Sequence, residues 1–126
     1  MSYGREELHQ LLTNPAITAM LTNGADSVWY DYVVPDTGKN DSVINYYRVA
    51  GVDLSLSYLQ TSYSVNCRAA DMATAEEIAK AVKNVLSRRY NKAVYFSATL
   101  LPVLPPADVT DGYNAPIDVI VRGRNL

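Results

Sequence analysis

The stretch from residue 62 to residue 86 constrains the fold most, because a strand, a short turn and an amphipathic helix follow one another within it. Tyr63, Val65 and Cys67 alternate with polar residues, and a period of two predicts a strand with one buried and one wet face. Beyond the turn, apolar residues recur at helical spacing along one stripe: Ala75, Ile78, Ala79, Val82, Val85 and Leu86. We therefore expect this helix to pack one face onto a sheet.

The start of the helix is predicted from a capping pair. Thr74 and Glu77 lie three residues apart, so the threonine hydroxyl can accept a hydrogen bond from the backbone N–H of Glu77 while the glutamate reaches back to Thr74. Asp71 falls in the turn before this pair. The helix is accordingly expected over residues 75–88.

The rest of the chain predicts further strands and a pair of short helices at the N-terminus. Leu8, Leu11 and Leu12 give the first helix an apolar stripe, and Asn14 and Pro15 have the cap and first-turn chemistry of a second helix. Besides the strand that contains Tyr63, β-forming residues predict strands at residues 27–34, 42–49, 52–58, 93–104 and 115–123.

Four irregularities are expected along these strands. Gly51 marks a bend, and residues 59–61 either reverse the chain or continue the preceding strand into the next. A turn is expected at residues 90–92, and Pro102 implies an edge or a bulge near the end of its strand.

The order of elements predicts an α+β fold in one domain, residues 1–126. If residues 52–58 continue into the strand that contains Tyr63, a helical pair is followed by three strands, the main helix and two more strands. Strands joined by short loops are mostly antiparallel. We therefore expect a mostly antiparallel β-sheet packed against the main helix, together with the short N-terminal helical pair.

Charge and hydropathy exclude several classes of protein. The 126 residues carry 11 basic and 13 acidic side chains, a net charge of -2, whereas a general nucleic-acid binder usually has a basic excess. No apolar run approaches the roughly 18 residues that cross a membrane, and no secretory signal is seen, so we expect no membrane partner and folding in a reducing cytoplasm.

Few residues offer catalytic or metal-binding chemistry. Cys67, the sole cysteine, lies on the apolar side of its strand, so a buried side chain is favoured over a reactive thiol. His9, the sole histidine, is expected as a solvated helix residue, because a general base would need a partner. Asp108 and Asp111 share a loop whose spacing does not fit a calcium site. We expect no enzyme activity, no cofactor and no metal.

The tyrosines are the more suggestive residues, since ten stand against one phenylalanine and one tryptophan. They are β-formers on a half-exposed sheet in one interpretation and subunit contacts in another, because tyrosine suits interfaces. Stacking on single-stranded nucleic acid is disfavoured, since few basic residues lie between them. The candidate interface residues are Tyr46, Tyr47, Tyr95, Asp108, Asp111 and Tyr113.

Four segments together resemble the tail-terminator, or tail-completion, proteins of long-tailed bacteriophages. A helical pair leads to a strand ending in proline, VWYDYVVP, and a polar loop precedes the strand VINYYRV. The strand-to-helix segment YSVNCRAADMATAEEIAKAVKNVL follows, and the ending LPPADVTDGYNAPIDVIVRG resembles the closing β-hairpin of that family with its aspartate-rich turn. The resemblance spans nearly the whole chain.

This resemblance implies a structural role in the virion, after assembly in the host cytoplasm. Such proteins form a ring, usually a hexamer, that caps the tail tube, stops its polymerisation and joins the tail to the head connector. The implied partners are copies of the chain, the tail-tube protein and the head-side connector or stopper, with viral DNA passing through the lumen without sequence-specific binding. The alternatives are another head–tail neck or minor tail component, or a small Tyr-rich binding module. Loops at residues 35–41 and 105–114 are either contacts above and below the ring or plain solvent loops.

Overall fold

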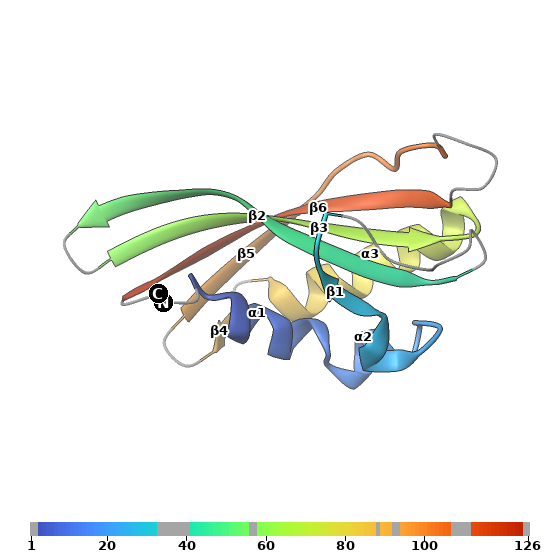
Figure 1. The fold of residues 1–126 in the computed structure, drawn as a ribbon, viewed down its shortest axis with the longest axis horizontal. Coiled ribbons are helices and arrows are strands. Elements are labelled where there is room, and N and C mark those ends of the chain that lie inside the picture. Colours follow the sequence, from blue (N-terminus) through green and yellow to red (C-terminus); the bar gives the residue numbers. More distant parts are fainter. Residues whose placement is uncertain are drawn as a thin grey trace.

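Two long neighbouring strands, at residues 58–69 and 113–124, form the centre of the sheet in this computed structural model (Figure 1). The structure describes residues 3–32, 41–55, 58–87, 89–91, 94–106 and 112–124. The helices are α1 (Arg5–Leu12), α2 (Pro15–Thr18), the 3-10 helix η1 (Gly24–Ser27) and α3 (Met72–Leu86). The strands are β1 (Val28–Tyr30), β2 (Val43–Ser55), β3 (Tyr58–Ala69), β4 (Arg89–Asn91), β5 (Val94–Leu100) and β6 (Tyr113–Arg124).

The strands form one sheet in the order β1-β2-β3-β6-β5-β4. All neighbours among the described strands are antiparallel except β1 and β2, which run parallel over three residue pairs from Val28↔Ile44 to Tyr30↔Tyr46. The main helix α3 runs along the central strands (Figure 1). The predicted α+β class, with a mostly antiparallel sheet, one main helix and an N-terminal helical pair, is confirmed.

One face of the sheet forms the core with the helices. Tyr63, Val65 and Cys67 of β3 are at most 1% exposed, as the alternation predicted, and the apolar stripe of α3 is buried against this face. The two N-terminal helices add three fully buried side chains to the same cluster: Leu8, Leu12 and Ile17. On the other face, Ser62 and Ser64 of β3 are partly exposed. The helix-covered face is therefore dry and the other polar.

The start of α3 corrects the predicted capping pair. The helix begins at Met72, and Asp71 is its N-cap, because the Asp71 Oδ1 accepts a hydrogen bond from the Thr74 backbone N–H at 2.8 Å. The Thr74 hydroxyl donates to the Asp71 Oδ2 at 2.9 Å, so it is engaged by the aspartate. These hydrogen bonds lower the pKa of Asp71. The prediction that Thr74 caps the helix was wrong, whereas the main helix predicted at about residues 75–88 is present as α3, which ends at Leu86.

The strands β2 and β3 form a longer hairpin than predicted. A single strand β2 continues through Gly51, which is paired with Thr61, so the predicted bend at Gly51 is wrong. Two irregularities lie instead on either side of Gly51, where the register shifts between Arg48 and Ala50 and between Asp53 and Ser55, as in β-bulges. The chain reverses between β2 and β3, ahead of the residues 59–61 considered for the turn, because Leu59 and its neighbours are already paired.

Three further boundaries differ from prediction. Strand β1 ends at Tyr30, and residues 33–34 of the expected strand lie outside the described residues. Residues 90–91, predicted as a turn, belong to β4, which pairs with β5. Strand β5 ends at Leu100, before Pro102 and before the predicted end at residue 104, and Leu104 forms an isolated bridge with Asn114 outside the strand. Residues 35–40 and 107–111 of the two predicted contact loops also lie outside the described residues.

The burial of the α3 stripe predicts a large effect on stability. Ile78 is fully buried at the centre of this stripe, so Ile78→Ala should lower the free energy of unfolding by about 2–5 kcal/mol through lost burial and a residual cavity. Lys80, exposed on the same helix, provides the matched control, and Lys80→Ala should change it by less than about 0.5 kcal/mol. Urea titration measures both. Equal effects of the two substitutions would contradict the packing described.

Candidate interaction surface

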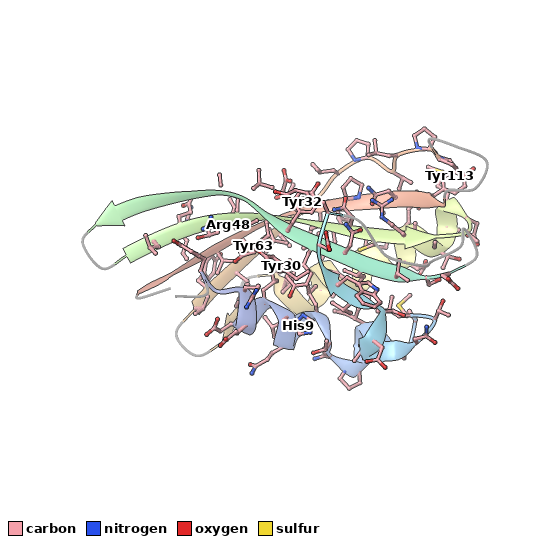
Figure 2. The ribbon with its side chains drawn as sticks, viewed as in Figure 1. His9, Tyr30, Tyr32, Arg48, Tyr63 and Tyr113 are labelled. Atoms are coloured by element: carbon pink, nitrogen blue, oxygen red, sulfur yellow. The ribbon has the colours of Figure 1, made fainter. Side chains whose placement is uncertain are left out.

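A cluster of aromatic rings joins α1 to the sheet. Tyr46 on β2 is 1% exposed, and the centroid of its ring lies 5.2 Å from the ring centroid of Tyr30 and 6.4 Å from that of Tyr63. The His9 Nδ1 lies 2.7 Å from the Tyr46 hydroxyl oxygen, within hydrogen-bonding distance. The expectation that His9 is a solvated side chain was therefore wrong, because helix periodicity cannot reveal a partner 37 residues away. Figure 2 shows His9 below Tyr30 and Tyr63.

Burial sets the electrostatics of this cluster. Burial raises the pKa of Tyr46, so its hydroxyl stays protonated and can donate. Burial, and then the nearby Arg5 charge, lower the pKa of His9. A neutral His9 with an unprotonated Nδ1 can accept the Tyr46 hydroxyl hydrogen, whereas a protonated ring cannot. The cluster therefore favours neutral His9.

Two arginines lie over tyrosine rings around this cluster. The Arg5 guanidinium carbon lies 4.9 Å from the centroid of the Tyr30 ring, and that of Arg48 lies 4.2 Å from the centroid of the Tyr3 ring. Both distances suit a cation–π contact. The Tyr63 hydroxyl also donates to the Tyr3 carbonyl at 2.9 Å. These contacts attach the beginning of the chain to β1, β2 and β3.

A hollow of about 380 Å³ opens beside the cluster, where β1 ends next to β2. We call it the tyrosine hollow, and it is lined by Tyr30, Asp31, Tyr32, Tyr47 and Arg48. The rings of Tyr32 and Tyr47 lie 4.4 Å apart, centroid to centroid, and Tyr32 is 68% exposed. Tyr30 is 44% exposed although its ring also contacts the buried Tyr46. The hollow thus presents aromatic surface to solvent.

The wall of the hollow is held by a buried amide. The Asn45 Nδ2 donates to the carbonyls of Asp31 and Tyr32 at 3.1 and 3.3 Å, and the Asn45 Oδ1 accepts from the Arg68 Nε at 2.9 Å. Asn45 is 0% exposed, so these bonds satisfy a group that would otherwise be costly to bury. They hold the chain after β1 against β2.

A second apolar surface follows β5. We call residues 100–106 (LLPVLPP) the leucine–proline segment; within it Leu100, Leu101 and Leu104 are 37%, 38% and 50% exposed. A groove of about 210 Å³ runs between this segment and α3, lined by Glu76, Ala79, Lys80, Leu100, Leu101, Pro102, Val103 and Ala115. This surface was not predicted, because the sequence indicated one continuous strand over residues 93–104. The only signal in the sequence was the unusual density of leucine and proline.

The predicted interface residues are dispersed over the fold. Tyr46 and Tyr47 are neighbours on β2 but face opposite sides of the sheet, Tyr46 into the core and Tyr47 into the hollow. Tyr95 on β5 is partly buried, and so is Tyr113 at the start of β6, far from the other labelled residues (Figure 2). The remaining two predicted residues, Asp108 and Asp111, lie outside the described residues. The interface role of all six stays a prediction.

Catalytic and metal chemistry have little basis in the described part of the chain. Cys67 is 0% exposed, and burial raises the pKa of its thiol, so the nucleophilic thiolate is disfavoured. Within the described ranges, no three His, Cys, Asp or Glu side chains are grouped so that they could hold a metal ion.

No helix among the described residues combines the length and the apolar character needed to span a membrane.

Comparison with known proteins relates the fold to a virion. No family model matches the sequence, and no curated protein matches it. A solved chain described as part of the "Virion of native gene transfer agent (GTA) particle" superposes with a TM-score of 0.61 at 14% identity. The match covers 94% of this chain and 92% of that chain. The two chains therefore share a fold over nearly their whole lengths.

The His9 environment predicts a pH dependence of stability. Because the folded pKa of His9 lies below its ordinary value of 6.5, the stabilisation from neutral His9 is present above 6.5 and is lost as the pH falls through the folded pKa. The difference in free energy of unfolding between wild type and His9→Gln should thus shrink between about pH 7.5 and pH 5. Urea titrations across this range measure it, and other titrating groups cancel in the difference. A difference that stays constant or grows toward acid would contradict the assignment.

The burial of Cys67 predicts a thiol that is silent in the folded protein. Under native conditions a maleimide or a disulfide reagent should leave Cys67 unmodified, and in denaturant it should label one thiol per chain, because the sequence holds a single cysteine. Mass spectrometry reads both states. Rapid native labelling would show that Cys67 is accessible.

Proposed function

We propose that this chain is a structural protein of a virion that assembles as a ring, a hexamer by analogy with the tail terminators, at the end of a phage tail tube. The observation that carries the proposal is the likeness to a virion chain over 94% of this chain and 92% of the other. The resemblance of the strand, loop and helix segments to tail terminators supports the same class of virion protein from the sequence alone.

The proposed ring would stop polymerisation of the tail-tube protein on one side and meet the head-side connector or stopper on the other. Viral DNA would pass through its lumen without sequence-specific contacts, which suits a chain with a net charge of -2. The candidate contact loops at residues 35–41 and 105–114 would lie toward these partners. No catalytic step belongs to this role.

The sheet offers what a ring contact requires. Strand β1 covers only Ile44 to Tyr46 of β2, and β4 covers only Val94 to Phe96 of β5. Among the described strands, the outer edges of β2 and β5 are therefore open beyond those pairs. Open edges are a liability that contact with a neighbouring copy relieves. A head-to-tail contact that closes on itself gives a ring.

The tyrosine hollow favours one alternative, a small binding module for a peptide or a single-stranded nucleic acid. Aromatic rings such as Tyr32 and Tyr47 can stack on bases, and Arg48 lies beside them. In this case the chain should bind single strands with an affinity that falls steeply with salt. A gel-shift series at several salt concentrations separates this alternative from the ring.

The ring predicts a direct effect on tail tubes. Purified protein added to a polymerising tail-tube protein should appear as a disc at one end of each tube and should shorten the tubes, because a capped end cannot grow. Negative-stain electron microscopy measures both. The matched control is Ile78→Ala protein at a temperature at which it is unfolded, which should leave tube length unchanged. Tubes that grow to the same lengths with and without the folded protein would refute the tail role.

A further inference from the structure

The two exposed apolar surfaces are chemically complementary. The tyrosine hollow is an aromatic depression, whereas the leucine–proline segment is a run of prolines and partly exposed leucines. The described lining of the hollow includes no residue of the segment, and β3 and β6 separate β2 from β5 in the sheet. Within one chain the hollow is therefore not filled by its own segment.

The leucine–proline segment is ordered in advance of any contact. Pro102, Pro105 and Pro106 fix their own φ angles, and each restricts the residue before it to an extended conformation. The bridge between Leu104 and Asn114 attaches the middle of the segment to β6, with backbone hydrogen bonds of 2.7 and 3.1 Å. Docking of such a segment loses little conformational entropy.

The spacing of the prolines fits an aromatic receptor. Pro102 and Pro105 stand in the pattern Pro-x-x-Pro, and segments of this kind dock into grooves lined by aromatic rings. The tyrosine hollow has such a lining, with Tyr30, Tyr32 and Tyr47. The charged groups also match.

Charge pairing can orient the two surfaces. The hollow carries Arg48 and Asp31, whereas the groove beside the segment carries Glu76 and Lys80. The basic Arg48 at the hollow and the acidic Glu76 beside the segment are therefore of opposite charge, and such pairs at the rim of an interface favour one register over others.

The bulge in β2 decides between strand addition and side-chain docking. Val49 is 62% exposed, and the register of β2 against β3 shifts beside it, directly after Arg48, as in a bulge. A bulge twists an edge away from a long added strand. The contact is therefore made by side chains in the hollow and not by a continued ladder.

We propose that the leucine–proline segment of one copy docks into the tyrosine hollow of the next copy. The two surfaces are different, so the contact is heterologous: the copy that contributes its segment keeps its hollow free for a further neighbour, and the copy that contributes its hollow keeps its segment free. This inference rests on the proposed function only in the expectation that successive contacts close into a ring. The contact between two copies is argued from the two surfaces alone.

Cross-linking between two cysteine variants tests the contact. Tyr32→Cys and affinity-tagged Leu101→Cys each place one exposed thiol on a different surface, and the buried Cys67 stays silent. The variants are mixed, alone and with tail tubes, and treated with a short bismaleimide. The mixed product should exceed that of a control pair, Ala16→Cys with Leu101→Cys, by roughly tenfold or more, because docking raises the local concentration of the thiols. Ala16 is exposed and belongs to neither surface.

A blocking substitution and the side products complete the test. Adding Leu104→Asp to the Leu101→Cys partner should return the yield to that of the control pair, since a charge replaces a half-exposed leucine of the segment. Mixed product at the control level, or products of Tyr32→Cys alone in excess, would overturn the contact. Capped tubes without the mixed product would leave the tail role standing and remove this contact. The mixed product without capped tubes would leave the contact standing and remove the tail role.

Discussion

The burial of the α3 stripe against β3 and β6 is the interaction on which the other features of the fold depend. Ile78 and Val82 lie against a face that includes Val65 and Ile117, all of them fully buried. Because successive residues of a strand face opposite sides, the burial of Val65 on this face determines which residues of β3 and of its paired strands face the core and which face solvent. Tyr46, paired with Val65, is thereby directed into the core, and the next residue of β2 is directed into the tyrosine hollow.

Features decided by local periodicity could be predicted from the sequence. The alternation in β3 and the stripe of α3 were correct because each reflects only which face of one element is buried. Asn14 likewise caps α2, with its Oδ1 accepting from the Ala16 backbone N–H at 2.9 Å. The cap of α3 was missed because Asp71 and Thr74 are both residue types that cap helix N-termini, and spacing alone does not rank them. The bend assigned to Gly51 was wrong because Gly51 stays paired with Thr61 in a continuous strand, and the register shifts lie on either side of it.

The candidate surfaces were harder to predict because contacts between distant parts of the chain create them. The tyrosine hollow depends on Asn45, which holds the carbonyls of Asp31 and Tyr32 across 14 and 13 residues. The leucine–proline segment depends on β5 ending at Leu100, after which the chain continues along β6 without a regular ladder. Ten tyrosines indicated an interface, but only the fold separates those in the core from those that face solvent.

Tyr30 lies between the hollow and the core, so the proposed contact is coupled to the stability of the fold. Tyr30 lines the hollow, and its ring also lies 5.2 Å from the buried ring of Tyr46, whose hydroxyl is within hydrogen-bonding distance of His9. The guanidinium of Arg5 on α1 lies over the same Tyr30 ring. A partner that docks against Tyr30 therefore restricts a side chain already held by α1 and β2. Helix α1 thus has a second role besides covering the sheet, since its Arg5 holds Tyr30 in place before any partner arrives, and a preformed site loses less entropy on binding.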